Sequence, residues 1–533
     1  MAQTRYITTP IYYVNDRPHI GHVYTTTVCD VWARFMRFSG DDVFFLTGTD
    51  EHGMKVEKSA QTRGIEPQAL ADENAAEFKR VMEKLDLRYD HFIRTTDPEH
   101  ERQVASFVET LLAKDAVYVG DFEGWYDEGQ EEYYTETRAR AMDFRSQVDQ
   151  RPLVRAKEKN YYFRLSAFQE PLEAWFRDHP DFVMPESRRN EVLGRLREGL
   201  QDVPMSRTNF TWGIPMPGAP EHVIYVWIDA LLNYATALGL GAPDGDWHRT
   251  RSKYWPADYH VIAKDILWFH AVIWPAILMA LDLPLPKHIY CHSWWISEGQ
   301  KMSKTLGNAI DLAAIDRYLD DYGHDMWRYY LVTRGPLSAT DSDFTAASFH
   351  DSYNTDLVNT VGNCASRVTA MIRKYHDGVI PNERQGGDRL VVGDVDWPTV
   401  TAAAVTAAHA AMERFDLAAA VEAGLGLVRQ VDAFINQTEP YKLAKVESER
   451  PRLDAVLYQC LEAFRIASLL LWPVIPRQME TAWAGLGLKV DPDAGNLAAL
   501  ATWGRLPAGQ TVEKLTLYPR RERPEPAACS ASS

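Results

Sequence analysis

An α/β pattern opens the chain, breaks off and later resumes, and this interruption constrains the fold more than any other feature. Residues 5–13 form a short β-rich run, 22–38 carry apolar side chains at helical spacing, and 43–47 are typical of a buried strand. Strand, helix and strand in this order predict the opening of a parallel sheet of the kind that binds nucleotides. Between about residues 116 and 222 Tyr, Glu and Arg dominate and the pattern is lost, so we expect an inserted domain there.

The pattern returns after the expected insertion. Apolar runs at 222–227, 260–263 and 287–293 predict strands, and helices are expected to begin at about Asp229 and Asp265. One sheet that the insertion interrupts and the later strands complete is the simplest arrangement. We therefore predict an α/β fold in which a Rossmann-type parallel-sheet domain contains an inserted connective domain.

The remainder of the chain is predicted to be all-α. From about Ala346 onward apolar residues recur at helical spacing, whereas 377–397 is rich in Gly, Pro, Asn and Asp and reads as a long surface loop. The last residues are charged, Pro-rich and then small, which predicts a disordered tail. The expected bounds are 1–115 and 223–296 for the two halves of the sheet domain, 116–222 for the insertion, 297–345 for a connecting region, 346–519 for the helical domain and 520–533 for the tail.

Bulk composition limits the classes of function. The net charge of −17 argues against a surface that binds nucleic acid throughout, although a local basic track for a structured RNA is compatible with it. No Cys-x-x-Cys occurs, so a disulfide framework and a zinc ribbon are not expected, and a reducing cytoplasm fits. The N-terminus lacks the features of a signal peptide. The most apolar stretch, 266–285, is broken by Asp282 and by prolines, which argues against a membrane span.

The first candidate motif is Pro18-His19-Ile20-Gly21-His22, at the expected junction of the first strand and the first helix. The N-terminus of a helix offers unpaired N–H groups to a phosphate, and Gly21 lets a base or a phosphate approach the backbone. His19 and His22 lie at i and i+3, so both rings can donate to a phosphate that develops charge. Alone, two nearby histidines are more often structural or surface residues.

The second candidate motif is Lys301-Met302-Ser303-Lys304-Thr305, which glycines flank on both sides. Two lysines three residues apart on such a loop form a mobile cationic clamp, and triphosphate chemistry needs one to neutralise charge on the leaving pyrophosphate. Taken alone, the segment is more often a solvated basic turn. The two motifs follow the first and the last strand of one predicted sheet, and this pairing favours a catalytic interpretation.

The two motifs together resemble the signatures of the class I aminoacyl-tRNA synthetases, which read His-Ile-Gly-His and Lys-Met-Ser-Lys-Ser. Here Thr305 replaces the final serine and keeps the hydroxyl group. The resemblance extends to the methionyl-tRNA synthetase family over about residues 5 to 520. It implies ATP contacts at His19, Gly21, His22, Lys301, Ser303 and Lys304, with the two histidines and the two lysines as the catalytic residues.

The same resemblance assigns a methionine site. Asp50 is placed to hold the α-amino group of the substrate through a charge-assisted contact. Thioether sulfur over aromatic rings gains about 0.3–1.5 kcal/mol, so an aromatic pocket suits methionine. From their spacing alone, the apolar residues assigned to this site would be interpreted as ordinary core packing. The family often has Pro where this chain has Leu231. The residues assigned to the methionine site are Ile11, Tyr13, Asp50, Trp227, Ala230, Leu231, Tyr234, Ile266 and His270.

The expected insertion differs from that of many family members. Zinc knuckles built on Cys-x-x-Cys are usual there, but the matching stretch 126–130 contains no cysteine, so we expect no zinc and no other protein-bound metal. The insertion is also too short for a hydrolytic editing domain. Relatives that select isoleucine, leucine or valine need such a domain because one methylene gives little discrimination.

The helical domain resembles the anticodon-binding domain of the family. Asn359, Asn363 and Arg367 recur at i, i+4 and i+8, so one helix face presents amide and guanidinium groups to unpaired bases. Tyr441 matches the loop where the family places a stacking Trp, and it can stack with less area. The resemblance implies tRNA contacts at Asn363, Arg367 and Tyr441. Without it, a helix cap and a surface aromatic would be the preferred interpretation.

The resemblance implies a cytoplasmic, monomeric methionine–tRNA ligase with methionine, ATP and tRNA(Met) as partners, and with Mg²⁺ accompanying the ATP. Two alternatives remain open from the residues. One is another class I synthetase for a small or apolar amino acid, although the cysteine enzyme is disfavoured because it selects its substrate with zinc. The other is a non-catalytic tRNA-binding protein that kept the fold, against which the intact lysine motif argues.

Overall fold

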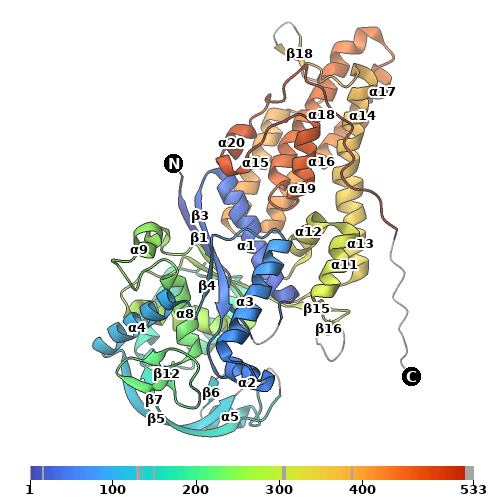
Figure 1. Ribbon diagram of the computed structural model, residues 1–533. Coiled ribbons are helices and arrows are strands. Elements are labelled where there is room, and N and C mark those ends of the chain that lie inside the picture. Colours follow the sequence, from blue (N-terminus) through green and yellow to red (C-terminus); the bar gives the residue numbers. More distant parts are fainter. Residues whose placement is uncertain are drawn as a thin grey trace, which may run out of the picture.

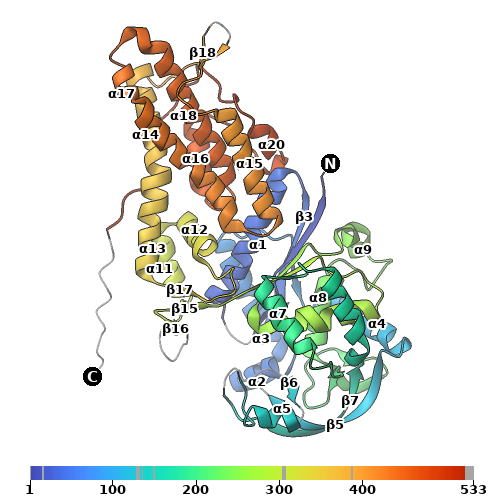
Figure 2. The same ribbon diagram turned by 180° about the vertical axis from the view of Figure 1, so that it is seen from behind.

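The computed structural model describes residues 2–14, 17–127, 132–134, 136–147, 150–302, 308–385 and 388–522. Figures 1 and 2 show an α/β part and a helical part stacked end to end, with the curled strands β5 and β7 at the end of the α/β part away from the helices. Among the described residues, no helix has the length and apolar character needed to cross a bilayer.

A parallel sheet forms the centre of the α/β part. Its order is β2-β3-β1-β13-β14-β8, and β4 pairs with β3 as well. The α/β class and the parallel sheet predicted from the sequence are therefore confirmed. The strands are β1 (Thr4–Thr8), β2 (Tyr12–Tyr13), β3 (Asp42–Asp50), β4 (His91–Arg94), β8 (Val183–Met184), β13 (Tyr259–Ala263) and β14 (His288–His292).

Helices cover both faces of this sheet, as the continuous apolar strands require. One face packs on α1 (Ile20–Ser39) and α3 (Pro67–Lys84), whose apolar side chains share a core with the helical domain. The other packs on α4 (Pro98–Ala113), α8 (Val226–Thr236) and α10 (Trp274–Ala280). The short helices α2 (Met54–Arg63) and α9 (Asp246–Arg251) lie at the periphery.

The span predicted as an insertion contributes more to the sheet than expected. β8, inside 116–222, pairs in parallel with β14 of the central sheet. Conversely, the run 222–227 was predicted to be a strand of that sheet, and this was wrong. β12 (Ala219–Ile224) pairs antiparallel with β10 (Ser206–Arg207) and β11 (Pro215–Met216) in a separate small sheet, and α8 begins at Val226. Both runs are short and apolar, so only the available partner decides which sheet each one joins.

The rest of that span is built around a long hairpin. β5 and β7 pair antiparallel from Val117 to Tyr126, and β6 and β9 extend them to four strands. Helices α6 and α7 follow the hairpin in the chain. The elements are β5 (Val117–Asp127), β6 (Glu132–Tyr134), α5 (Glu136–Ala141), β7 (Val154–Phe163), α6 (Gln169–Asp178), α7 (Glu186–Leu196) and β9 (Val203–Pro204).

Two further segments depart from the expected helices. The helix expected from about Asp265 is a 3₁₀ turn, η3 (Lys264–Ile266), then a π-helical turn, η4 (Phe269–Ile273), and only then α10. The sheet is followed by β15 (Trp295–Ser297), β16 (Gln300–Lys301) and β17 (Ser342–Phe344), which form a three-stranded sheet. Between β16 and β17 lie α11 (Leu312–Tyr322) and α12 (His324–Arg334).

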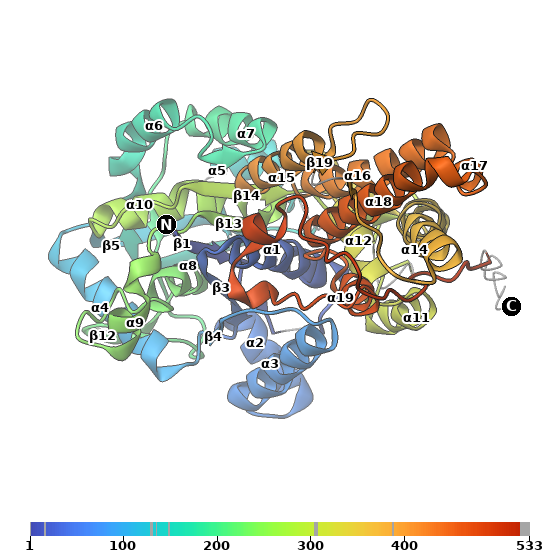
Figure 3. The ribbon, with the colours of Figure 1, turned by 90° about the horizontal axis from the view of Figure 1, so that it is seen from above.

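The helical C-terminal region expected from the sequence is present. Figure 3, which looks down on this region, shows α15 and α16 next to α1. A surface loop was expected over 377–397, and its described part contains the short pair β18 and β19 and the buried Ile380. The helices are α13 (Ala346–Ser352), η5 (Tyr353–Gly362), α14 (Asn363–His376), α15 (Trp397–Glu413), α16 (Leu417–Thr438), α17 (Pro440–Leu443), α18 (Arg450–Leu471), α19 (Pro476–Gly485) and α20 (Leu497–Leu500).

Buried polar contacts fix the helical domain on α1. Trp32 of α1 donates from its indole to the carbonyl of Met412 at 2.9 Å. Arg328 of α12 contacts the Asp30 carboxylate at 2.7 Å and donates to the carbonyl of Pro473 at 2.8 Å. These groups are almost fully buried, so the two parts share one core rather than a wet interface.

The chain beyond α20 returns along α14 in extended form (Figure 1). The N–H of Leu515 donates to the Thr369 hydroxyl at 3.1 Å, and Arg520 donates to the side chain of Asn359 at 3.1 Å. Residues 520–522 of the predicted disordered tail therefore belong to the ordered arm. Residues 523–533, the rest of that prediction, lie outside the described part of the chain.

Candidate active site

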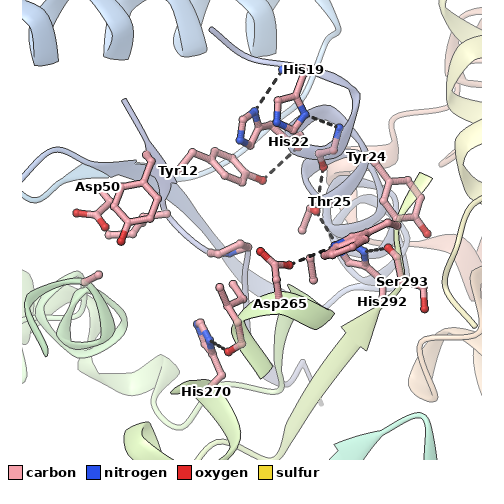
Figure 4. Close-up of a pocket in the computed structure, with 18 of the residues that line it drawn as sticks. Tyr12, His19, His22, Tyr24, Thr25, Asp50, Asp265, His270, His292 and Ser293 are labelled. Carbon is pink, nitrogen blue, oxygen red and sulfur yellow. Dashed lines mark hydrogen bonds between the residues drawn. The ribbon is translucent and has the colours of Figure 1, made fainter. Parts of the chain in front are cut away.

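A cavity of about 460 Å³ opens at the carboxyl edge of the central sheet, where parallel sheets place their ligand sites. Figure 4 shows Asp50 and His292 on opposite sides of it, with the two signature histidines between them at the start of α1. The predicted site residues that line the cavity are Ile11, Tyr13, His19, Gly21, His22, Asp50, Trp227, Ala230, Leu231, Tyr234, Ile266 and His270.

The histidine pair caps its own helix. The His19 ring accepts through Nδ1 from the N–H of Gly21 at 3.1 Å, and the His22 ring accepts through Nδ1 from the N–H of His19 at 3.2 Å. The two rings stack with centroids 3.9 Å apart. A side chain at position 21 would meet the His19 ring, since an added Cβ would lie 3.0 Å from Cε1, so glycine keeps this turn compact.

These contacts decide which ring nitrogens carry protons. Because both Nδ1 atoms accept a backbone N–H, each neutral ring holds its hydrogen on Nε2 and can donate it to a ligand. Burial lowers the pKa of His22 well below its usual value, and the neighbouring His19 lowers it further. The His22 ring is therefore a neutral hydrogen-bond donor at physiological pH.

Helix α8 supplies one wall of the cavity. Trp227, Ala230, Leu231 and Tyr234 lie on one helix face and line the cavity together, as their spacing allowed. The Tyr234 hydroxyl lies 2.7 Å from Nε2 of His270. His270 Nδ1 lies 3.0 Å from the carbonyl oxygen of Ile266 and donates to it, so Tyr234 must be the donor to Nε2.

Burial keeps this wall uncharged. It lowers the pKa of His270 to about 4 and raises that of Tyr234 far above 10. The indole of Trp227 stacks on Phe269 with centroids 3.8 Å apart, and Tyr13 meets it edge-on at 6.4 Å. The α8 side of the cavity is thus aromatic and neutral, while Asp50 lines the same cavity with a carboxylate.

Lys301, the first residue of the lysine motif, lies beside the cavity. Lys301 ends β16, is exposed, and places Nζ 4.9 Å from the centre of the Trp294 ring, which lines the cavity. Lys264 lies over the same ring at 4.2 Å and pairs with Asp341 at 2.6 Å. Ser303, Lys304 and Thr305, predicted to complete the motif, lie outside the described residues.

Several lining residues were not predicted from the sequence. His292 Nδ1 donates to the carbonyl of Ser293 at 2.7 Å, so its Nε2 accepts from the Thr25 hydroxyl at 2.8 Å. Burial lowers the pKa of His292 to about 4. Asp265 accepts from the indole of Trp294 at 3.3 Å. The position of His292 at the carboxyl end of β14 was the available signal, because that edge of a parallel sheet carries the ligand site.

The predicted tRNA contacts lie on α14 and α17, the helices at the tip of the helical domain away from the α/β part (Figure 1). Asn363 is exposed at the start of α14, Arg367 donates to the side chain of Asn436 at 2.9 Å, and Tyr441 of α17 is 46% exposed. The Tyr441 hydroxyl donates to Glu439 at 2.7 Å. This hydrogen bond raises the pKa of Tyr441, while the charge of nearby Arg367 lowers it. Asn359 departs from the expected even spacing because it lies in the π-helical η5 and contacts Arg520.

Within the described ranges, no group of three or more His, Cys, Asp or Glu side chains is arranged to hold a metal ion. Of the stretch 126–130 that was predicted to lack a zinc knuckle, residues 128–130 lie outside these ranges. The Trp125 indole donates to Glu136 at 2.5 Å, beside a small apolar cluster around Tyr134 and Leu153. This cluster packs the part of the insertion where relatives were expected to bind zinc.

Comparison with known families gives one clear match. The model of the family described as "tRNA synthetases class I (M)" matches residues 5–142 and 140–369. The chain is 40% identical over 537 residues to a methionine–tRNA ligase from Halalkalibacterium halodurans, covering 99% of this chain and 80% of the relative. It is 42% identical over 510 residues to one from Thermotoga maritima, covering 95% and 78%.

Solved structures give the same result. The methionyl-tRNA synthetase of Mycobacterium tuberculosis in complex with methionyl-adenylate superposes with a TM-score of 0.87 at 35% identity, covering 97% of this chain and all of that one. The apo form of that enzyme superposes with a TM-score of 0.82 at 32% identity, covering 98% and 99%.

Proposed function

The chain belongs to the methionine branch of the class I tRNA synthetases, and from this premise we propose how its residues activate methionine and transfer it to tRNA. It is an ATP-dependent methionine–tRNA ligase. The observation that carries the residue assignments is the single cavity shared by the histidine pair of α1, the aromatic wall of α8 and Asp50. The roles that follow are proposals about those residues.

In the first step a carboxylate oxygen of methionine attacks the α-phosphorus of ATP. The bond from this phosphorus to the oxygen that bridges to the β-phosphate breaks, so methionyl-adenylate forms and pyrophosphate leaves. The Nε2–H groups of His19 and His22 donate to phosphate oxygens as charge shifts during the attack. Lys301 and Lys304 hold the pyrophosphate. No side chain becomes covalently bound, and positioning and electrostatics supply the rate.

The aromatic wall selects the amino acid. The methionine side chain lies against Trp227, Ala230 and Tyr234, where polarizable sulfur gains from contact with aromatic rings. Asp50 accepts hydrogen bonds from the α-ammonium group and so directs the carboxylate toward the histidine pair. Ile11, Tyr13, Leu231, Ile266 and His270 complete the pocket.

Mg²⁺ accompanies the ATP in this proposal. It would arrive with the nucleotide and would need no dedicated protein cage, as is common for Mg²⁺ at nucleotides. When bound, it neutralises charge on the triphosphate.

In the second step a terminal ribose hydroxyl of tRNA(Met) attacks the activated carbonyl carbon, and AMP leaves. Recognition of the tRNA depends on the tip of the helical domain. Tyr441 stacks on an unpaired anticodon base, and Asn363 and Arg367 hydrogen-bond base edges. We place the reaction in the cytoplasm and expect one chain to suffice for it.

ATP–pyrophosphate exchange with each amino acid in turn tests the proposal. Exchange with methionine alone is the expected result. Exchange with another amino acid would mean a different substrate within class I, and no exchange with any of them would mean a non-catalytic tRNA-binding protein. A second assay, the charging of tRNA(Met) transcripts, then establishes the transfer step.

A further inference from the structure

Three consecutive residues at the end of β3 point in different directions. Asp50 lines the cavity, whereas Glu51 and His52, the next two residues, are buried and do not line it. Glu51 accepts from Arg94 of β4 at 2.7 Å and 2.9 Å, so its carboxylate is fixed by a two-pronged contact. His52 makes a different connection, which crosses from this loop to α8.

His52 belongs to a buried polar chain behind the methionine wall. Its Nδ1 lies 2.7 Å from Oδ2 of Asp229, and His100 Nε2 lies 2.7 Å from Oδ1 of the same carboxylate. His100 Nδ1 is in turn 2.7 Å from the Thr236 hydroxyl. The exposed fractions are 4% for His52, 1% for Asp229 and 0% for His100, so bulk solvent screens these contacts little.

Pairing between His52 and Asp229 keeps both groups charged even though they are buried. Burial by itself would lower the pKa of His52, but the Asp229 carboxylate, aided by Glu101 at 3.6 Å, raises it to about 10. Burial would raise the pKa of Asp229, and the charge of His52 overcomes this and lowers it. His52 is therefore a cation and Asp229 an anion, and a charge-assisted hydrogen bond joins the loop of Asp50 to α8.

The contact between His52 and Asp229 holds α8 on the side away from the cavity. At 100° per residue, Asp229 lies about 160° around the helix from Trp227 and about 140° from Tyr234, so it points away from the face that lines the cavity. Asp229 therefore holds α8 from the side away from the cavity, through its contact with His52. Because His52 is only two residues from Asp50, this contact sets the distance between Asp50 and the face of α8 that lines the cavity. Asp50 is proposed to hold one end of methionine and the α8 face the other.

We propose that His52, Asp229 and His100 form a positioning triad that sets the distance between Asp50 and the α8 wall, and thereby determines the affinity and the length selectivity for methionine. This inference rests on the proposed function. None of the three residues lines the cavity, so they act through Asp50 and α8 rather than by touching the substrate. Partners that orient the residues contacting a ligand commonly change its binding about 10–100-fold when they are removed.

The test is ATP–pyrophosphate exchange with His52→Leu, His52→Asn and Asp229→Asn, with KM for methionine and for ATP measured separately. His52→Leu is expected to raise KM for methionine about tenfold or more and to leave KM for ATP within about twofold. His52→Asn keeps an N–H donor near the position of Nδ1 and should recover part of the loss. Discrimination against norleucine and homocysteine should fall in His52→Leu, because the length of the pocket is no longer fixed.

His376→Asn is the matched control. His376 also faces a carboxylate, that of Asp454 at 3.2 Å, but this pair lies in the helical domain, and both KM values should stay unchanged. If His52→Leu or Asp229→Asn fails to fold by circular dichroism, His100→Gln, which alters only the α4 end, should still raise KM for methionine selectively.

A purely structural role would lower kcat or the active fraction while leaving KM for methionine unchanged, or would raise both KM values equally. Either result would overturn the triad. Wild-type exchange separates this failure from a failure of the proposed function, since a wild-type protein that does not exchange with methionine refutes the function itself.

Discussion

The cavity at the sheet edge and the tip of the helical domain are built in opposite ways. In the cavity, His270 is buried and His22 is partly buried, and each ring accepts from or donates to a specified backbone group. At the tip, Asn363 is exposed and Tyr441 keeps 46% of its surface in solvent. The first region holds its polar groups in place before any ligand arrives, and the second presents them to solvent.

The difference follows the two tasks proposed for these regions. Stabilising charge at a reacting phosphate requires donors that do not reorganise, which a buried network provides. Unpaired bases are recognised by stacking and by adaptable hydrogen bonds, which exposed side chains provide. Substitutions in the cavity should therefore change activation, whereas substitutions at the tip should change only tRNA recognition.

The largest effect is expected from the lysine motif. Lys304→Ala should reduce kcat for ATP–pyrophosphate exchange about 10²–10³-fold, because a group that neutralises the leaving pyrophosphate is lost. Circular dichroism should show an unchanged fold. Lys445→Ala, on the helical domain, is the control and should exchange at the wild-type rate. A normal exchange rate in Lys304→Ala would remove the lysines from the proposed mechanism.

A smaller effect is expected from the aromatic wall. Tyr234→Phe removes the donor to His270 and leaves a buried acceptor unsatisfied, so KM for methionine should rise about tenfold. KM for ATP is expected to change little, because Tyr234 belongs to the methionine side of the cavity. Steady-state exchange kinetics measure both constants, and equal increases in the two would contradict the assignment.

At the tip, Tyr441→Ala should reduce kcat/KM for tRNA charging about tenfold, since one stacked base contributes about 1–3 kcal/mol. Exchange should be unaffected, which distinguishes this variant from both cavity variants. Tyr441→Phe keeps the ring and should charge tRNA normally. Equal loss of exchange and charging in Tyr441→Ala would show that the helical domain does not act as a separate reader.

The smallest effect is expected for the pH dependence of the melting temperature, to which two buried histidines contribute. Burial lowers the pKa of His270 and of His292 to about 4, so between pH 6.5 and about 4 the unfolded chain binds protons that the folded chain does not. Their stabilising contribution is complete above pH 6.5 and is lost as the pH falls toward 4. The Tm should therefore drop by about 2–5 °C between pH 7 and pH 5 at a fixed scan rate.

His270→Gln should lessen this pH dependence, because it removes one of the groups responsible. Asn363→Ala at the tip removes no titrating group and should keep the wild-type slope. His52 works in the other direction, because its pKa is raised to about 10, so the stability that it contributes is complete below pH 6.5 and is lost as the pH rises from there to about 10. An unchanged Tm from pH 7 to pH 5 would mean that these rings are not buried in the neutral form.

Much of the α/β part followed from local pattern. The helix after the first strand was expected over 22–38 and spans Ile20–Ser39, and the strand expected over 260–263 is β13. Periodicity also placed Trp227, Ala230, Leu231 and Tyr234 on one helix face, and these residues do line one cavity. These features depend on residues close together in the chain, so the sequence contains the information directly.

Other features depended on partners far apart in the chain. The run 222–227 and β8 are both short and rich in apolar residues, yet only β8 joins the central sheet, because β14 offers it an edge. The buried link from His52 to Asp229 spans residues 177 apart, and no spacing rule predicts it.

By itself the sequence determined the chemistry of this protein, because a histidine pair and a lysine motif flanking a parallel sheet need only local turns to present their side chains. The tertiary structure alone decided which groups are buried together, and therefore which rings are neutral, which carboxylates are paired and how Asp50 is set against α8. Charge states and distances across a cavity depend on every element that excludes water from it, and those elements come from the whole chain.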